Sequence, residues 1–184
     1  KKTIYYEKAT LKFYNVPIFY FPKFFHPDPT VKRQSGFLVP FFTNSTIVGS
    51  GFALPYYWAI NDDKDLTFTT KLYAKDNAIF MNEFRQAFRN NGLFTLDSSY
   101  TVGHKNITTT KTSGSRNHIF SNLDLNFNKD DSYESKLSLK VQRTSNDTYF
   151  RVHDINTTFV NAENTNLENE IMYNYNDDEK YLMV

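Results

Sequence analysis

Two clusters of histidine and acidic residues have types and spacings that could bind a metal ion. His26 and Asp28 are close together, but prolines stand between and after them and no further ligand is near. Asp62, Asp63 and Asp65 resemble part of a calcium loop, but they lack its glycine and its closing glutamate. Protein metal sites need several convergent ligands. The sequence therefore favours a solvated loop at the first cluster, a charged turn at the second, and no metal site.

Nucleophilic catalysis has no better basis in the sequence. Ser35, His104 and His153 are far apart, and neither a Gly-x-Ser-x-Gly motif nor a glycine-rich phosphate loop is present. A nucleophile needs a base within hydrogen-bonding distance, and nothing in this spacing supplies one. We therefore predict that the chain is not an enzyme, has no catalytic residues and needs no cofactor.

Two other groups of residues each have two explanations. Lys32 and Arg33 are adjacent cations that could bind lipid phosphates, or could be solvated charges of a hinge. Tyr56, Tyr57 and Trp58 could stack on a sugar in a soluble lectin-like domain, or could belong to the aromatic girdle at a bilayer interface. The choice depends on the fold that carries these residues.

The composition predicts an all-β fold. Of the 184 residues, 18 are Phe and 13 are Tyr. Aromatic side chains fit the pleated surface of a sheet better than a helix. The net charge of +1 creates no field that would attract nucleic acid, so we expect no nucleic-acid partner. The absence of cysteine is compatible with either redox compartment.

Beyond residue 35, apolar and polar residues alternate as in strands with one apolar and one polar face. In one segment Leu66, Phe68 and Leu72 share a face, opposite two threonines and a lysine. The same pattern recurs in the segments 52–58, 80–88, 94–102, 119–127 and 133–141. Strands of about 10 residues can cross a bilayer at the tilt of a barrel, whereas no stretch approaches the roughly 18 apolar residues of a membrane helix.

The links between these segments differ in length in an ordered way. Tight, turn-rich links are expected at 61–64, 90–92, 129–132 and 176–179. The intervening links are 44–47 and 74–78, which are short, and 104–116 and 145–166, which are long and polar. Short turns at one end and longer loops at the other are typical of an up-and-down outer-membrane barrel.

A proline-rich segment precedes the alternating part of the chain. Two short strands are expected between Tyr5 and Pro22, followed by a connector at 21–29, because its prolines remove ladder donors. The chain starts without methionine or a signal region and ends inside a predicted strand at Val184. We therefore expect an internal piece of a longer protein, with two parts joined by this connector.

Three blocks resemble the LPS-assembly protein family, LptD, also called organic solvent tolerance protein. They are Tyr-Asn-Val-Pro-Ile-Phe-Tyr-Phe-Pro at 14–22, Arg-Gln-Ser-Gly-Phe-Leu-Val-Pro at 33–40, and Leu-Pro-Tyr-Tyr-Trp at 54–58. Glu-Phe-Arg at 83–85 fits the same family, and the resemblance is specific up to about that point. It implies that residues 1–34 are the last strands of a periplasmic β-jellyroll with a proline-rich hinge. Residues 35–184 would be the first antiparallel strands of a large outer-membrane β-barrel, here incomplete and open.

The resemblance also implies a route for lipopolysaccharide (LPS). In this family the jellyroll receives the lipid, and the first barrel strand pairs weakly with the last, so that a seam opens sideways toward the outer leaflet. Two prolines belong to this lateral gate and correspond to Pro40 and Pro55, with Gly49 and Gly51 loosening the same region. Each proline deletes one ladder N–H, which weakens pairing by about 1 kcal/mol. The implied hinge and neck residues are Pro22, Pro27, Pro29, Lys32 and Arg33.

The partners are likewise implied by the resemblance. The lumen of the family's barrel holds a small LptE-like lipoprotein plug, and an LptA-like jellyroll bridge protein joins the periplasmic part through a portion that precedes this chain. The other implied partners are LPS and outer-membrane lipid. The expected localisation is the outer membrane of a Gram-negative bacterium, with the N-terminal segment periplasmic. Alternation makes five residues candidates for the luminal face: Thr67, Thr69, Lys71, Glu83 and Arg85.

Two other functions fit parts of the pattern. A generic outer-membrane channel would use the same strands to line a pore, although it needs neither a proline-rich neck nor a weakened seam. A soluble secreted β-sandwich that binds carbohydrate would use the tyrosines and the tryptophan at 56–58. Detergent dependence would separate the first two functions from the third.

Overall fold

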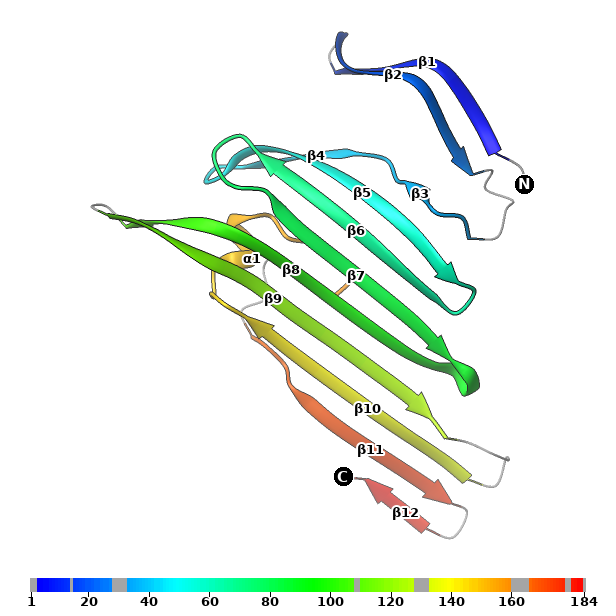
Figure 1. Cartoon of the computed structure of the whole chain (residues 1–184). Coiled ribbons are helices and arrows are strands. Elements are labelled where there is room, and N and C mark those ends of the chain that lie inside the picture. Colours follow the sequence, from blue (N-terminus) through cyan, green and yellow to red (C-terminus); the bar gives the residue numbers. More distant parts are fainter. Residues whose placement is uncertain are drawn as a thin grey trace.

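The structure, a computed structural model, describes residues 3–13, 15–27, 33–107, 110–127, 133–159, 166–177 and 180–183. Nearly all the regular structure in these ranges is β-strand (Figure 1), which confirms the predicted all-β class. The elements are β1 (Thr3–Phe13), β2 (Val16–Pro27), β3 (Gly36–Phe37), β4 (Phe41–Ser45), β5 (Gly49–Asn61), β6 (Lys64–Tyr73), β7 (Ile79–Phe88), η1 (Arg89–Asn91), β8 (Gly92–Ile107), β9 (Thr110–Asn126), β10 (Tyr133–Thr144), α1 (Tyr149–Val152), β11 (Glu170–Asp177) and β12 (Lys180–Met183).

The strands of the described ranges form two antiparallel sheets. β1 pairs with β2 in a separate hairpin, and the other ten strands form one large sheet. From β5 to β12 each strand pairs with the next in sequence, while β3 and β4 pair in succession along the free edge of β5. This large sheet is an open, up-and-down meander, because no pairing joins its two edges in the part of the chain described. The predicted incomplete, antiparallel arrangement is confirmed.

The first hairpin is longer than we predicted from its prolines. β2 continues through Pro22 to Pro27, so the prediction of an unpaired connector beginning at residue 21 is wrong. Glu7 pairs with Lys23 and Ala9 with Phe21, while Lys8 between them has a left-handed backbone with φ 57° and is skipped. The hairpin therefore passes Pro22 without requiring a ladder bond there, as edge strands allow.

The second departure from the prediction is the hairpin of β8 and β9. We predicted a long polar loop at 104–116, but the two strands stay paired from Leu93 and Asp124 to Ile107 and Thr110. A two-stranded projection beyond the rest of the sheet needs no apolar face. Threonine-rich sequence has the β propensity to form it, so low hydrophobicity was a poor indicator of a loop here.

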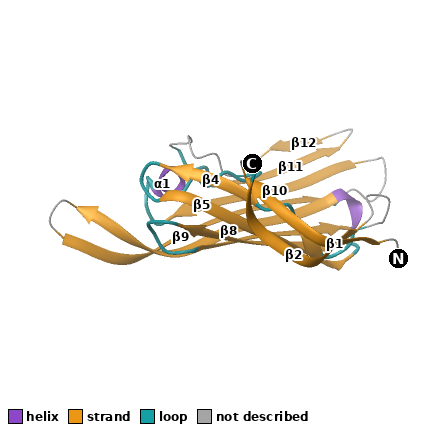
Figure 2. Cartoon of the chain, turned by 90° about the horizontal axis from the view of Figure 1, so that it is seen from above, coloured by secondary structure: helices purple, strands orange, loops and turns teal. Residues whose placement is uncertain are grey.

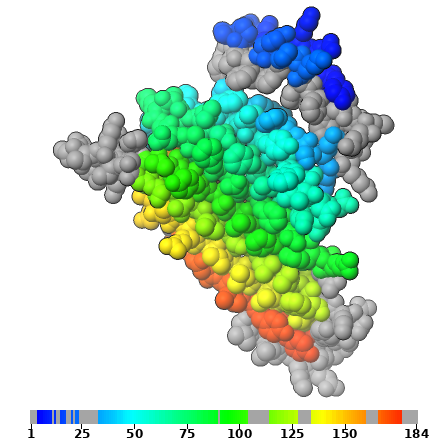
Figure 3. Space-filling view, in the orientation of Figure 1, coloured from blue at the N-terminus to red at the C-terminus, as the bar shows by residue number. Residues whose placement is uncertain are grey.

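The register gives the large sheet two different faces. One, which we call the outward face, carries cross-strand pairs that include Phe52–Leu72, Leu66–Phe84, Phe80–Tyr100 and Leu123–Leu139. Large apolar side chains stay exposed on it, for example Trp58 at 51% and Leu72 at 53%. Figure 3 shows the sheet from the side away from α1 as one continuous surface. The opposite, inner face is polar along most of its length.

The apolar core lies on the inner face. Ile79 and Met81 of β7 and Phe120 of β9 pack against Tyr149, Phe150 and Ile155, which belong to the segment between β10 and β11. This segment folds back so that α1 lies against the sheet near one end of the strands (Figure 2). We predicted a long polar link at 145–166, and no strand lies in its described part. The prediction did not indicate that this link folds inward, which it does because Tyr149, Phe150 and Ile155 are buried. Among the described residues no helix is long and apolar enough to cross a membrane.

Candidate functional site

The free edge formed by β3 and β4 is interrupted beside the two predicted gate prolines. Phe37 pairs with Tyr56 and Phe41 with Ala53, so four steps along the edge match three along β5. One residue is therefore extra, as in a β-bulge. Pro40 ends the unpaired stretch and Pro55 lies opposite it, where its carbonyl accepts a 2.9 Å hydrogen bond from the Leu38 amide.

The two predicted gate glycines have distinct local roles. Gly49 has a left-handed backbone with φ 80° at the start of β5, which glycine adopts without strain. A Cβ on Gly51 would lie 2.6 Å from Thr43 Oγ1 and 2.9 Å from Tyr73 Cδ1. Gly51 thus lets the Tyr73 ring pack closely over β5, a contact that sequence alternation did not indicate.

The predicted neck residues are only partly described. Pro22 and Pro27 lie in β2, whereas Pro29 and Lys32 lie outside the described residues. Arg33 is described, and its guanidinium reaches the large sheet. Just after it, Ser35 Oγ accepts a 3.0 Å hydrogen bond from the Ala59 amide of β5. The chain entering the sheet is therefore fixed by side chains before β3 begins.

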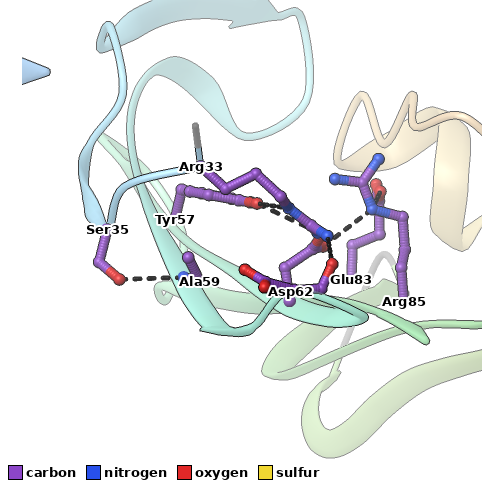
Figure 4. A network of polar contacts seen from close by, with 8 residues as sticks. Arg33, Ser35, Tyr57, Ala59, Asp62, Glu83 and Arg85 are labelled. Carbon is purple, nitrogen blue, oxygen red and sulfur yellow. Dashed lines mark hydrogen bonds and ion pairs between the residues drawn. The ribbon is translucent and has the colours of Figure 1, made fainter. Parts of the chain in front are cut away.

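Arg33 belongs to a polar cluster, which we call the neck cluster and which Figure 4 shows around Arg33, Tyr57 and Arg85. Asp65 is at its centre. Arg33 forms an ion pair with Asp65 Oδ2, and its Nε donates to Tyr57 Oη at 3.0 Å. Arg85 Nε lies 2.9 Å from Asp65 Oδ1, and Tyr57 Oη donates to Oδ2 at 3.3 Å. Arg33 Nη1 also donates to the Asp62 carbonyl at 2.6 Å. Residues from the neck, β5, β6 and β7 thus meet at one carboxylate.

Burial makes Asp65 the residue on which the neck cluster depends. Its side chain is 1% exposed, whereas those of Arg33 and Arg85 are 39% and 45% exposed. A buried carboxylate without partners is costly, and two guanidinium groups and a phenol offset that cost. Of the three aspartates that suggested a charged turn, Asp62 and Asp63 are exposed and Asp65 is a buried ion-pair partner.

The five predicted luminal residues lie on the inner face. Thr67 pairs with Glu83, Asp65 with Arg85, and Thr69 and Lys71 follow on the same parity of β6. They do not form one open surface, however. Lys71 is 3% exposed, because the segment 145–159 covers it and its ammonium donates to the Asp154 carbonyl at 2.7 Å.

A buried chain of hydrogen bonds joins β8 and β9 to the segment 145–159 on the same inner face. His118 Nε2 lies 3.0 Å from Asp97 Oδ1, Ser99 Oγ lies 2.6 Å from His118 Nδ1, and Tyr149 Oη lies 2.7 Å from Ser99 Oγ. Thr157 Oγ1 donates to the second oxygen of Asp97. These groups form one continuous chain from Tyr149 through Ser99 and His118 to the Asp97 carboxylate. We call this the buried relay.

The buried relay has the residue types of a catalytic triad without the access that catalysis requires. His118 is 0% exposed, and the Ser99 hydroxyl is covered by the Tyr149 phenol. The rings of Phe120 and Phe150 lie edge-on to His118 with centroids 5.4 and 5.2 Å away. No substrate can reach this serine in the folded state, so the relay joins strands to the infolded segment.

Sequence reasoning missed the buried relay because its residues meet only through strand register. Asp97 and Ser99 alternate on β8, and Ser99 pairs with His118 of β9. Burial raises the pKa of Tyr149 to about 12, so its hydroxyl stays protonated at neutral pH. Burial also lowers the pKa of nearby His153 to about 4, and its Nδ1 has no hydrogen-bond partner.

The remaining sequence candidates do not converge. His26 lies in β2 and His104 in β8, and Asp28 is outside the described residues. Within the described ranges no group of three or more His, Cys, Asp or Glu side chains is placed to hold a metal ion. Tyr56 and Trp58 lie on the outward face, whereas Tyr57 points inward to Asp65, so these three aromatic residues do not form a common platform.

Comparisons with known proteins give the chain its family. The sequence profile of the family described as LptD protein matches residues 4–183. The LPS-assembly protein LptD of Methylococcus capsulatus is 29% identical over 144 residues, which are 75% of this chain and 14% of that protein. Its counterpart in Nitrosococcus oceani is 32% identical over 131 residues, 68% of this chain and 18% of that protein. That of Shewanella sp. MR-4 is 39% identical over 77 residues, 42% and 10% respectively.

The chain thus spans between a tenth and a fifth of the length of these relatives. The resemblance predicted from three short blocks extends over almost every residue. Because the family profile covers the described strands from β1 to β12, the chain belongs to the LptD protein family.

Proposed function

We propose that this chain is part of an outer-membrane translocon that assembles LPS into the outer leaflet. In this proposal, residues 1–34 are the end of a periplasmic jellyroll with its hinge, and residues 35–184 are the first strands of a barrel wall. LPS moves from the first part to the second and leaves sideways beside β4. No bond is made or broken, so the chain acts as a guide and not as an enzyme.

The outward face supports the membrane part of the proposal. It is lined by Phe, Leu, Tyr and Trp side chains that remain exposed. The strands β5 to β10 are 10 to 17 residues long, and about 9 to 11 residues suffice to cross a bilayer when a strand is tilted. Lipid tails would cover this face, so that its apolar side chains would not be exposed to water.

The interrupted edge is the observation that carries the transport proposal. β3 and β4 are short, separated by residues 38–40, and held to β5 by two and five residue pairs. A strand with a break beside Pro40 and Pro55 has fewer ladder bonds to lose when it moves. A simple pore has no need of such a weak edge, which favours a translocon over a generic channel.

The neck cluster fits a role in orienting the incoming jellyroll. It joins Arg33, one of the predicted hinge and neck residues, to a buried carboxylate of β6. An LptA-like bridge protein would deliver LPS to the jellyroll, and an LptE-like plug would contact the inner face. Since the segment 145–159 covers Lys71, the open plug surface would comprise Thr67, Thr69, Glu83 and Arg85.

A photo-crosslinking residue tests the lipid path in the full-length parent protein in cells. The probe replaces Phe41, which is 43% exposed at the start of β4, and a control probe replaces Glu134, which is exposed in β10. We expect an LPS adduct at position 41 and none at position 134. If the protein reaches the outer membrane and position 41 forms no adduct, lateral exit is wrong and a generic channel becomes the better account.

A further inference from the structure

We propose that residues 145–159 act as a strap that holds the edge strand β4 in place from the inner face, so that β4 moves freely only when the strap is released. The strap would be a positioning element for the gate. This inference rests on the proposed function for its biological meaning, although the mechanical coupling itself can be tested independently.

The strap is anchored far from β4. Tyr149, Phe150 and Ile155 are at most 5% exposed and pack on β7 and β9 through Ile79 and Phe120. The buried relay adds a polar anchor, since the hydroxyls of Tyr149 and Ser99 of β8 are hydrogen-bonded at 2.7 Å. Apolar burial and a satisfied polar network act at the same place, so this end of the strap is the fixed one.

Three consecutive carbonyls of the strap then bind the strands nearest the edge. The carbonyl of Val152 accepts a 3.0 Å hydrogen bond from Ser45 Oγ. The carbonyls of His153 and Asp154 accept from the side chains of Tyr73 and Lys71, respectively. The last carbonyls of a helix have no partner within the helix, so α1 presents acceptors that side chains of the sheet satisfy.

These contacts reach both ends of β4. Ser45 is its last residue, and it binds the strap directly. Phe41 is its first residue, and the Lys71 ammonium that binds Asp154 lies 5.8 Å from the Phe41 ring centroid, within the range of a cation–π contact. Among the described strands β4 pairs with β5 alone, by five residue pairs. Contacts from the strap therefore form a large share of what holds it.

Hydrogen–deuterium exchange of the full-length protein in outer-membrane vesicles tests the coupling. Phe150→Ala loosens the anchor without touching β4, and Tyr149→Phe removes only the hydroxyl that is hydrogen-bonded to Ser99. We expect Phe150→Ala to speed exchange of the peptide covering Phe41–Ser45 by about tenfold or more, and Tyr149→Phe to act in the same direction by a smaller factor. A peptide covering Leu137–Val141 in β10 should not change in either variant.

Two controls match these variants on the outward face. Phe84→Ala removes an aromatic ring, and Tyr100→Phe removes a phenolic hydroxyl. Both residues lie on the outward face, away from the strap. Both should leave exchange in β4 unchanged. If either strap variant speeds exchange of residues 149–159 while β4 exchange stays constant, the strap does not hold β4. Should Phe150→Ala fail to reach the membrane, Tyr149→Phe decides the question alone.

The outcomes separate this inference from the proposed function. Faster β4 exchange together with no LPS adduct at position 41 would keep the strap and reject lateral exit. An adduct at position 41 together with unchanged β4 exchange would keep lateral exit and reject the strap. In the joint prediction, Tyr149→Phe also changes the yield of the adduct at position 41, whereas Tyr100→Phe does not.

Discussion

The neck cluster and the buried relay lie on the same inner face but hold their parts together in different ways. Asp65 is buried, yet both of its arginines are more than a third exposed and one comes from the hinge. Asp97 and His118 are both buried, and aromatic rings surround the histidine. Side chains that stay in contact with water can leave an ion pair at low cost in free energy, because water replaces the lost partner. A buried network loses most of its stabilising free energy when one member is removed.

This difference suggests a division of labour along the strands. In the proposed function, the neck must adapt its orientation while the lipid passes, and the partly exposed arginines allow this. The segment 145–159 needs a fixed seat, and the buried relay supplies it. Three predictions test whether the neck cluster and the buried relay differ as described.

The largest effect is expected from breaking the buried relay. His118→Ala leaves Asp97 buried without its main donor and opens a cavity between Phe120 and Phe150, so we expect a loss of about 3 kcal/mol in the free energy of unfolding. Denaturant titration of the full-length protein in lipid vesicles measures this loss. Ile119→Ala, the next residue along β9, faces outward and should cost much less. Equal losses for the two variants would mean that the relay adds nothing beyond packing.

A smaller effect is expected at the neck cluster. Asp65→Asn removes the charge that pairs with Arg33 and Arg85 and should cost about 1–2 kcal/mol, since exposed guanidinium groups recover solvation. We expect the main change to be local, as faster protease cleavage in the hinge before Arg33. Asp62→Asn is the control, because Arg33 contacts only the backbone carbonyl of Asp62, which the substitution leaves in place. If the hinge is cleaved at the same rate in both variants, the Asp65 charge does not hold the hinge in place.

A separate, pH-dependent effect is expected at His153. Burial lowers the pKa of His153 from 6.5 to about 4, where Asp76 opposes the shift and Arg116 and Lys71 add to it. The unfolded chain therefore binds a proton below pH 6.5 that the folded chain does not bind until about pH 4. The contribution of this group to stability is complete above pH 6.5 and is lost as the pH falls toward 4.

His153→Phe tests that pH dependence. The variant keeps the backbone carbonyl that accepts from Tyr73, so the strap contact remains. We expect its stability to vary less than that of the wild type as the pH falls from 6.5 toward 4, when both are measured by denaturant titration in the same vesicles. If the two proteins lose stability in parallel over this range, His153 does not control the seat of the strap.

Several features of the fold could be predicted because they depend on neighbours along the chain. Alternation at 66–72 placed Leu66 and Phe68 on one face and Thr67 and Thr69 on the other, and the register has the same division. Turn-rich sequence located the link between β5 and β6. Prolines were weaker guides, since Pro22 and Pro27 lie within β2 while Pro40 and Pro55 border a real interruption.

Alternation of residue types by itself determined that the chain is built of two-faced strands, because side chains of a strand point to opposite sides at every step. Only the tertiary structure decided which polar residues meet. Ser99 faces His118 through strand register, Arg33 reaches Asp65 of β6 from the segment before β3, and Tyr149 returns to the inner face because its neighbours Phe150 and Ile155 are buried there. These contacts join residues that are distant in sequence. They depend on strand register and on the burial of a returning segment, and both of these follow from the packing of the whole sheet.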